Sequence, residues 1–254
     1  MTREDHVEAK RVADIAGDLL MDLRERLVAA DTPPAVLKAE GDRQAHERIM
    51  EELRASRPDD AILSEEGSDS AERLAFERVW IVDPLDGTRE FSEHPRDDWA
   101  VHVALAEAGR PVVGAVALPA AGLTLSTAEP TPTLGPIPDR PRMLVSRTRP
   151  PAAATLVADA MNAELVEMGS AGAKTMAVVR GLADIYVHSG GQYEWDNCAP
   201  AAVAASAGLH TSRIDGSDLV YNNADPYLPD LLVCRTELAD QALDVLSRFE
   251  ETTG

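Results

Sequence analysis

The sequence predicts a mixed α/β protein with an α+β N-terminal half and an α/β C-terminal half. Three observations support this prediction. Apolar residues recur at helical spacing over residues 6–30 and 42–54. Between residues 99 and 125, short apolar runs joined by tight turns are typical of an antiparallel sheet. From residue 142 onward, strand-like runs alternate with helical ones, as they do in βα units.

The N-terminal half begins with the two amphipathic helices, which Asp31-Thr32-Pro33-Pro34 separates. Short strands at 61–63 and 79–82 each end at acidic residues, and Pro84 is expected to end the second strand because it has no N–H to donate. Strands at 99–106, 112–118 and 123–125 then predict an antiparallel meander. His102 lies on the first of these strands and is expected to be a packed or surface histidine rather than a metal ligand.

The Pro-rich segment 129–141 predicts a linker between an N-terminal lobe, residues 1–128, and a C-terminal lobe, residues 142–254. The C-terminal lobe should hold strands at 142–146, 163–168, 183–187 and 231–234. Helices are expected between and after them, at 152–160, 171–180, 195–207 and 238–249. Residues 189–196 are expected to form a flexible loop that runs into a helix start.

The amino-acid composition argues against several classes of function. A net charge of −20 argues against nucleic acid and anionic membranes as partners. The N-terminus lacks the apolar core of a signal peptide, and no window of about 18 residues is apolar enough to span a membrane. The chain has two cysteines, which fits a reducing cytoplasm, and Cys198 is expected to be a buried structural thiol. These features predict a cytoplasmic protein that binds a small molecule.

The segment Asp83-Pro84-Leu85-Asp86-Gly87-Thr88 places two carboxylates beside a predicted helix start. Mg²⁺ prefers oxygen ligands and is commonly held by one or two carboxylates together with substrate phosphate. Phosphate oxygens can bind to the first N–H groups of a helix, and a glycine there lets the backbone approach closely. The alternative is an ordinary surface turn, as most Asp-Pro and Asp-Gly pairs are.

Two further acidic motifs accompany this segment. Ser64-Glu65-Glu66 follows a predicted strand, and Trp195-Asp196 begins a predicted helix. Taken singly, the first fits an exposed acidic turn and the second fits an acid that satisfies a helix dipole. Their joint occurrence carries more information than any one of them.

The three motifs, in this order, resemble those of the inositol monophosphatase superfamily of Mg²⁺-dependent, lithium-inhibited phosphatases. The resemblance covers roughly Val7 to Cys234. It implies a layered αβαβα sandwich of the inositol monophosphatase and fructose-1,6-bisphosphatase type, with the site between the two lobes. Three segments are similar to CysQ-type 3′-phosphoadenosine-5′-phosphate phosphatases within the superfamily, namely residues 144–147, 169–174 and 195–200.

The resemblance also implies the ligands of two or three Mg²⁺ ions. Glu65, Asp83 and the Leu85 carbonyl would bind the first ion, and Asp83, Asp86 and Asp196 would bind the second. Asp42 matches the acid that holds a third, weaker ion. The catalytic residues implied are Glu65 and Thr88, which would orient the attacking water, together with Asp83. The substrate-binding residues implied are Asp86, Gly87, Thr88, Ser146, Arg147, Ser170, Lys174 and Asp196.

Three departures from the family pattern accompany these matches. Lys38-Ala39-Glu40-Gly41 replaces the usual Thr-containing turn before Asp42, and Ser189 stands where inositol monophosphatases carry an acid that binds inositol hydroxyls. The segment 129–141 lacks the usual Gly-rich hairpin. The second departure weakens an inositol assignment but leaves it open.

The function expected from this resemblance is Mg²⁺-dependent hydrolysis of 3′-phosphoadenosine-5′-phosphate to AMP and phosphate, which would clear a by-product of sulfate assimilation. An inositol-1-phosphate or fructose-1,6-bisphosphate phosphatase is the first alternative. A non-catalytic protein that binds Mg²⁺ and a phosphorylated ligand is the second. The resemblance further implies lithium sensitivity and a homodimer.

Overall fold

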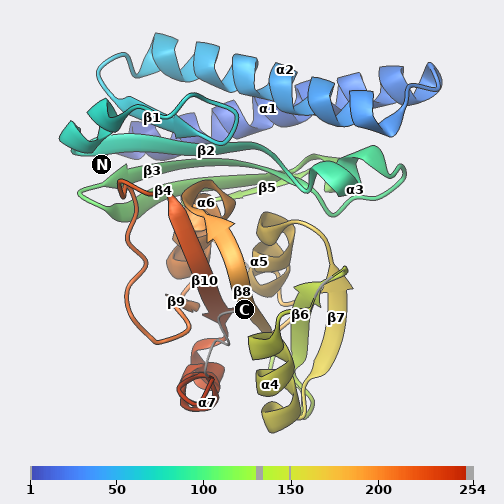
Figure 1. Ribbon diagram of the computed structural model, residues 1–254, viewed down its shortest axis with the longest axis vertical. Helices are drawn as coiled ribbons and strands as arrows, with labels where there is room; N and C mark the ends of the chain where they lie inside the picture. Colours follow the sequence, from blue (N-terminus) through green and yellow to red (C-terminus); the bar gives the residue numbers. More distant parts are fainter. Residues whose placement is uncertain (1, 130–133, 149, 250–254) are drawn as a thin grey trace.

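The computed structural model describes residues 2–129, 134–148 and 150–249, so part of the predicted linker, residues 130–133, lies outside the described residues. Two sheets alternate with three layers of helices (Figure 1). Helices α1 and α2 cover one face of the first sheet, helices α5 and α6 lie between the two sheets, and α4 and α7 cover the second sheet. The predicted αβαβα sandwich is confirmed.

The outer layer consists of α1 (Arg3–Ala29) and α2 (Pro34–Ser56). The first helix agrees with the prediction, but the second begins eight residues earlier than expected, so the predicted start at residue 42 was wrong. Pro34 explains the difference, because proline is well suited to the first position of a helix. Gly41 lies inside α2, where a Cβ would stand 2.8 Å from Leu85 Cδ2 and 2.9 Å from Phe91 Cε1. The glycine therefore lets α2 approach the segment that carries the predicted site.

The first sheet has the order β1-β2-β3-β4-β5. Its strands are β1 (Ala61–Ser64), β2 (Arg78–Asp86), β3 (Ala100–Glu107), β4 (Arg110–Leu118) and β5 (Leu123–Ser126). The predicted meander of β3, β4 and β5 is confirmed, while β1 pairs with β2 in parallel. Short helices η1 (Ala71–Ala75), α3 (Thr88–Ser92) and η2 (Pro119–Ala121) connect the strands.

Strand β2 extends through Pro84 to Asp86, so the prediction that Pro84 ends the strand was wrong. Asp83 pairs with His102 and Asp86 pairs with Ala100, which places three steps of β2 opposite two steps of β3. This irregularity accommodates a proline, because the residues inside a bulge need not donate to the ladder. It also turns the end of β2, from which both predicted carboxylates project.

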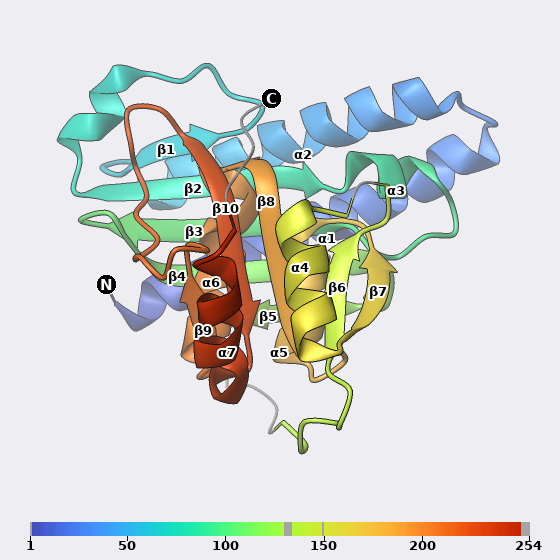
Figure 2. The same cartoon turned by 60° about the horizontal axis from the view of Figure 1, so that its bottom comes forward.

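The second sheet has the order β7-β6-β8-β10-β9. Its strands are β6 (Arg142–Ser146), β7 (Glu164–Met168), β8 (Ile185–Tyr193), β9 (His210–Ser212) and β10 (Tyr227–Cys234). Its helices are α4 (Ala152–Met161), α5 (Ala171–Val179), α6 (Glu194–Ser206) and α7 (Thr236–Leu246). Figure 2 shows α4 and α7 in front of this sheet. The predicted strands and helices of this half are present, whereas β9 was not predicted.

Strand β8 is longer than predicted, because residues 189–193 continue the strand instead of forming a flexible loop. They pair with β10 across an irregularity between Leu228 and Asp230. Gly190 and Gly191 have φ values of 106° and 97°, which glycine adopts without steric cost. The two glycines mark a bend within a strand rather than a loop, and the strand leads directly into α6.

The helices of the middle layer fill the space between the sheets. One apolar core joins residues of the first sheet, such as Val116, to α6 residues such as Ala199 and Val203. Cys198 lies in this core, fully buried and free, as predicted. Small side chains allow the close approach: a Cβ on Gly114 of β4 would lie 2.6 Å from the carbonyl oxygen of Ala199.

We expect Gly114→Ala to lower the free energy of unfolding by about 2 to 3 kcal/mol, because the added methyl group must displace the backbone of α6. Urea denaturation measures the effect. Gly135→Ala is the matched control, since a Cβ there would meet nothing within 4 Å. A Gly114→Ala variant as stable as the control would contradict this account of the packing.

Asp5 ties the start of α1 to the first sheet. Its buried carboxylate accepts a hydrogen bond from the Thr2 N–H at 2.8 Å. It also accepts hydrogen bonds at 3.1 Å from Arg57 Nε and Arg78 Nη2. Burial alone would raise the pKa of Asp5, but these donors outweigh it and lower the pKa from 3.8 to about 2.

Because the pKa of Asp5 is depressed in the folded state, its contribution to stability is present above pH 3.8 and is lost as the pH falls towards 2. We expect Asp5→Asn to reduce the free energy of unfolding at pH 7 by about 2 kcal/mol, and to reduce it less at pH 3. Urea denaturation at both pH values tests this. Asp14→Asn, which breaks a partly exposed pair with Lys10, should change stability by less than about 0.5 kcal/mol. An equal loss at both pH values for Asp5→Asn would contradict the assignment.

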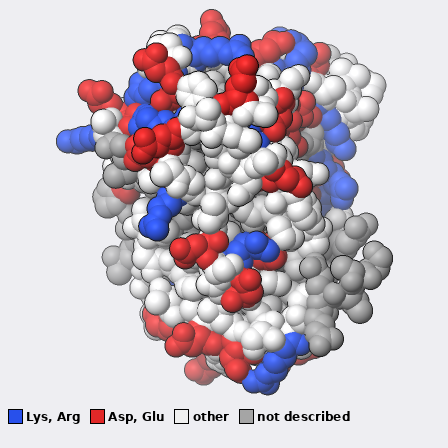
Figure 3. Space-filling view, turned by 60° about the vertical axis from the view of Figure 1, so that its left-hand side comes forward, with Lys and Arg blue, Asp and Glu red and all other residues white. Residues whose placement is uncertain are grey.

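The surface carries charges of both signs. On the face seen in Figure 3, Lys and Arg side chains lie singly or in small groups among acidic and uncharged residues. A face of this kind does not provide the broad basic surface that nucleic-acid backbones require. Among the described helices, none has both the length and the apolar character needed to cross a membrane.

Candidate active site

Three carboxylates meet where β2 ends and α6 begins. Asp83, Asp86 and Asp196 each offer an oxygen, and these oxygens all lie within 4.8 Å of one another. Asp83 is 1% exposed and Asp86 is 8% exposed. Hard oxygen donors at this spacing fit a divalent cation such as Mg²⁺ or Ca²⁺. The sequence motifs that carry Asp83 and Asp196 are thus brought together across more than 100 residues of chain.

Glu65 lies beside this cluster, at the end of β1. Its carboxyl group is within hydrogen-bonding distance of Asp83, although the residue as a whole is exposed. Burial of the carboxyl group, together with the nearby acids, raises the pKa of Glu65 to about 7. The parallel pairing of β1 and β2 places Ser64 opposite Val82, which sets Glu65 next to Asp83.

The acids of the cluster disfavour one another's charge. Burial is the main reason why the pKa of Asp83 lies well above its ordinary value, and the charges of Glu65, Asp86 and Asp196 raise it further. The pKa of Asp196 is likewise raised, to about 7, by burial and by Asp86. Buried carboxylates at such distances need a compensating positive charge. A bound cation would supply that charge.

Asp86 Oδ2 accepts hydrogen bonds from two groups and lies within ion-pair distance of a third. They are Ser170 Oγ at 2.5 Å, the Gly172 N–H at 2.7 Å and His102 Nε2 at 3.2 Å. Burial by itself would raise the pKa of Asp86, but His102, Ser170 and Gly172 together hold it below its usual range. Asp86 is therefore the member of the cluster that keeps its negative charge most readily.

The backbone after Asp86 forms a turn at Gly87 that leads into a helix start, as the motif predicted. Gly87 has φ 87°, and a Cβ there would lie 3.1 Å from Ser170 Cβ and 3.2 Å from the Asp98 carbonyl oxygen. Thr88 begins α3, and its hydroxyl donates to the Leu85 carbonyl oxygen at 3.1 Å. The same hydroxyl lies 3.4 Å from Asp42 Oδ1, so α2 brings Asp42 next to Thr88. Burial and Glu66 raise the pKa of Asp42 to about 6.

A cavity of about 250 Å³ lies beside the turn that follows Asp86. Its walls come from α3 and the preceding turn, from the end of β6 and from the start of α5. Six of the predicted substrate-binding residues line it: Gly87, Thr88, Ser146, Arg147, Ser170 and Lys174. The remaining two, Asp86 and Asp196, belong to the acidic cluster.

Both predicted cations of this cavity are already engaged. Lys174 is 5% exposed, and its Nζ donates to the Ser170 carbonyl oxygen at 2.8 Å and the Gly169 carbonyl oxygen at 3.3 Å. Arg147 Nη2 lies 2.9 Å from carboxylate oxygens of both Glu90 and Glu93. Lys174 thus orders the loop before α5, while Arg147 neutralises two acids at the rim of the cavity.

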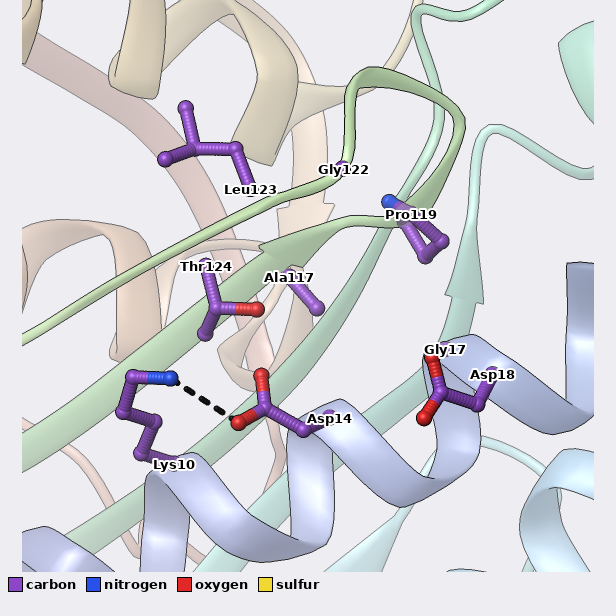
Figure 4. A pocket seen from close by; sticks show the side chains of 9 residues that line it. All are labelled: Lys10, Asp14, Gly17, Asp18, Ala117, Pro119, Gly122, Leu123 and Thr124. Atoms are coloured by element: carbon purple, nitrogen blue, oxygen red, sulfur yellow. Dashed lines mark hydrogen bonds and ion pairs between the residues drawn. The ribbon is translucent and has the colours of Figure 1, made fainter.

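A second cavity, of about 330 Å³, lies between α1 and the turn from β4 to β5. Figure 4 shows Lys10 pointing towards Asp14, with which it forms an ion pair at 2.9 Å, and Asp18 further along the same helix. None of the nine residues drawn there is a predicted site residue. The acidic cluster and the cavity beside it therefore remain the candidate site.

Sequence reasoning missed the role of His102 at the site. The residue is fully buried, which confirms the prediction that it is packed, but it packs against Asp86. The signal lay in the pairing of the two strands, because β3 follows β2 in the meander and places His102 opposite Asp83. A polar residue in an otherwise apolar strand, next to the acidic strand end, was the available indication.

Comparison with known proteins identifies the family of the chain. The chain matches the inositol monophosphatase family over residues 3–133 and 143–246. The chain belongs to the inositol monophosphatase family. The family resemblance noted from the three motifs is thereby confirmed, and the acidic cluster lies at the residues that carried it.

Curated relatives in the family are close in sequence. The chain is 49% identical to a protein of Mycobacterium tuberculosis named 3′-phosphoadenosine 5′-phosphate phosphatase, over 91% of this chain and 89% of the relative. It is 47% identical to the protein of the same name from Mycobacterium leprae, over 95% and 93%. It is 33% identical to the Escherichia coli protein named 3′(2′),5′-bisphosphate nucleotidase CysQ, over 86% and 94%.

Solved structures of the family share the fold. An inositol monophosphatase from Staphylococcus aureus superposes with a TM-score of 0.78 at 19% identity, covering 98% of this chain and all of the other. A CysQ protein from Bacteroides thetaiotaomicron superposes with a TM-score of 0.73 at 27% identity, covering 92% and 97%.

Proposed function

We propose that this protein is a Mg²⁺-dependent phosphatase that hydrolyses the 3′-phosphate of 3′-phosphoadenosine-5′-phosphate, giving AMP and phosphate. The observation that carries the proposal is the buried cluster of Asp83, Asp86 and Asp196, with Glu65 in contact, beside a polar cavity. The choice of substrate is supported by the names of the mycobacterial and Escherichia coli relatives. Placement in sulfate assimilation, lithium sensitivity, a cytoplasmic location and a homodimer belong to the same proposal.

The proposed metal ligands are the residues that the motifs indicated. Glu65, Asp83 and the Leu85 carbonyl would hold one Mg²⁺, and Asp83, Asp86 and Asp196 would hold a second. Asp42, which lies 3.4 Å from the Thr88 hydroxyl, would hold a third. When bound, two such ions stabilise the charge on the attacking and leaving oxygens of an in-line displacement.

The residues of the chain would then position the reacting groups. The Glu65 carboxylate, at the end of β1 beside Asp83, would orient the attacking water. Thr88 would orient that water through its hydroxyl, and Gly87 leaves room for the transferred phosphate to approach the backbone. Little further chemistry is required of the protein, because positioning and charge stabilisation dominate phosphoryl transfer.

The cavity beside the cluster is the proposed place for the rest of the nucleotide. Ser146 and Ser170 offer neutral hydroxyl groups there, and Arg147 offers a guanidinium. Since Glu90 and Glu93 hold Arg147, a second phosphate would bind by competing with these carboxylates. Lys174 would contribute mainly by ordering the loop of residues 168–170.

Phosphate release from 3′-phosphoadenosine-5′-phosphate, inositol-1-phosphate and fructose-1,6-bisphosphate, each with Mg²⁺ and with EDTA, tests the proposal. We expect a Mg²⁺-dependent kcat/KM for the nucleotide at least tenfold above the values for the other two. A higher value for inositol-1-phosphate or fructose-1,6-bisphosphate would reject the substrate assignment and keep the phosphatase. Binding of Mg²⁺ and nucleotide without phosphate release would instead favour a non-catalytic binding protein.

A further inference from the structure

The imidazole of His102 connects two elements that carry proposed metal ligands. His102 lies in the middle of β3 and is fully buried. Its Nε2 stands 3.2 Å from Asp86 Oδ2, at the end of β2. Its Nδ1 stands 3.0 Å from the Trp195 carbonyl oxygen, in the first turn of α6. Asp196, the next residue along the chain, belongs to the acidic cluster.

Both partners of the ring are oxygen atoms that accept hydrogen bonds. A backbone carbonyl can only accept, and so can an ionised carboxylate. Nδ1 therefore donates to the Trp195 carbonyl oxygen, whereas Nε2 makes a close ion-pair contact with Asp86 Oδ2 without the alignment of a hydrogen bond. One rigid ring thus fixes the separation between the Asp86 carboxylate and the start of α6.

The groups around Asp86 also decide which of its oxygens is available to a cation. Ser170 Oγ and the Gly172 N–H donate to Oδ2, at 2.5 Å and 2.7 Å, and use both of its lone pairs. His102 Nε2 covers the same oxygen at an ion-pair distance of 3.2 Å. A cation must then bind to Oδ1, which makes Asp86 a ligand through a single oxygen.

The surroundings hold the ring in this position. A Cβ on Gly172 would lie 2.0 Å from His102 Nε2, so the first turn of α5 contacts the ring directly. Asp83 is the residue opposite His102 in the β2–β3 ladder, and its Oδ2 lies 4.0 Å from Nδ1. The ring therefore has no room to rotate away from Asp86 without moving a neighbouring element.

We propose that His102 is a positioning residue of the metal site, which orients the Asp86 carboxylate through Nε2 and couples it to the start of α6 through Nδ1. The proposal rests on the proposed metal site but not on the identity of the substrate. Residues that orient metal ligands typically contribute 10-fold to 100-fold to metal affinity.

Two substitutions separate the two contacts of the ring. In His102→Asn the amide nitrogen falls near the place of Nδ1, so the variant keeps the hydrogen bond to Trp195 and loses the contact with Asp86. In His102→Gln the amide nitrogen reaches towards Asp86 instead. We expect His102→Asn to bind Mg²⁺ 10-fold to 100-fold more weakly than wild type, and His102→Gln to recover most of the affinity. His210→Asn, on β9, is the matched control.

Isothermal titration calorimetry of Mg²⁺ into metal-free protein, without substrate, measures these affinities. Circular dichroism shows whether each variant is folded; for a variant that is unfolded without metal, the Mg²⁺ concentration that restores the folded spectrum gives the same comparison. Wild-type affinity in His102→Asn, or equal losses in the two variants, would overturn the proposal. Wild-type protein that binds no Mg²⁺ would overturn the metal site itself, and the positioning role with it.

Discussion

Asp83→Asn is expected to lower kcat/KM for 3′-phosphoadenosine-5′-phosphate by at least about 10³-fold at saturating Mg²⁺. Asp83 is the proposed ligand shared by two ions, and an amide supplies neither the charge nor the paired oxygens that such a bridging position requires. Release of inorganic phosphate, followed at several Mg²⁺ concentrations, measures the loss. Raising the Mg²⁺ concentration should not restore the rate.

The same substitution should stabilise the metal-free protein. Asp83 is 1% exposed and faces three other carboxyl groups, so a neutral amide removes both a desolvation cost and a repulsion. The Leu85 N–H, which donates to Asp83 Oδ1 at 3.0 Å, can keep an oxygen partner in the variant. In EDTA the thermal midpoint should therefore rise by a few degrees, while added Mg²⁺ should no longer raise it as it does in wild type.

The exposed Asp218 provides the matched control, because Asp218→Asn changes the formal charge of the chain equally. It should leave both the rate and the metal-dependent stabilisation unchanged. Retention of more than a tenth of wild-type activity in Asp83→Asn would show that the acidic cluster is not the catalytic metal site.

Gly172→Ala is expected to reduce kcat/KM by about 100-fold and to weaken the Mg²⁺ affinity. The new methyl group would lie 2.0 Å from His102 Nε2, so either the imidazole or the first turn of α5 must move. In both cases Asp86 Oδ2 loses a contact, because the Gly172 N–H donates to this atom and His102 forms an ion pair with it. Losses of this size are usual when residues that orient metal ligands are disturbed.

A double variant shows whether the effect of Gly172→Ala arises from this contact. Combining it with His102→Ala removes the collision, so the free energy of unfolding should recover relative to Gly172→Ala alone. Activity should stay low, because the contact of His102 with Asp86 is still missing. Additive losses of stability in the double variant would contradict the collision, and wild-type activity in Gly172→Ala would contradict the tight packing of the site.

The sequence correctly predicted those features that depend on residues close together in the chain. Asp83, Asp86 and Gly87 lie within five residues, and their motif predicted the turn and the start of α3, although the strand ends at Asp86 rather than before Pro84. Short apolar runs joined by tight turns predicted β3, β4 and β5 for the same reason, because neighbouring strands of a meander follow one another in sequence. The layered sandwich as a whole came from the family resemblance.

The features that the sequence did not reveal depend on partners far away in the chain. Residues 189–193 contain two glycines and resemble a loop, yet their pairing with β10, more than 30 residues later, keeps them in a strand. Pro84 remains in β2 because it lies at a bulge, where no backbone N–H is needed for a hydrogen bond to β3. His102 became part of the site only through the strand register and the contact with α5. The carbonyl oxygens that Lys174 contacts were likewise not predicted, and its role in substrate binding stays a prediction.

The middle layer also has a consequence for synthesis of the chain. The first sheet is complete at Ser126, but α6, which covers its inner face, ends only at Ser206. At roughly 5 to 20 residues per second, the ribosome needs on the order of 4 to 16 seconds to supply the intervening residues. Throughout that interval the inner faces of β2, β3 and β4 are apolar surfaces without their covering helix. The nascent chain is therefore most exposed to aggregation, and most dependent on chaperones, before α6 leaves the ribosome.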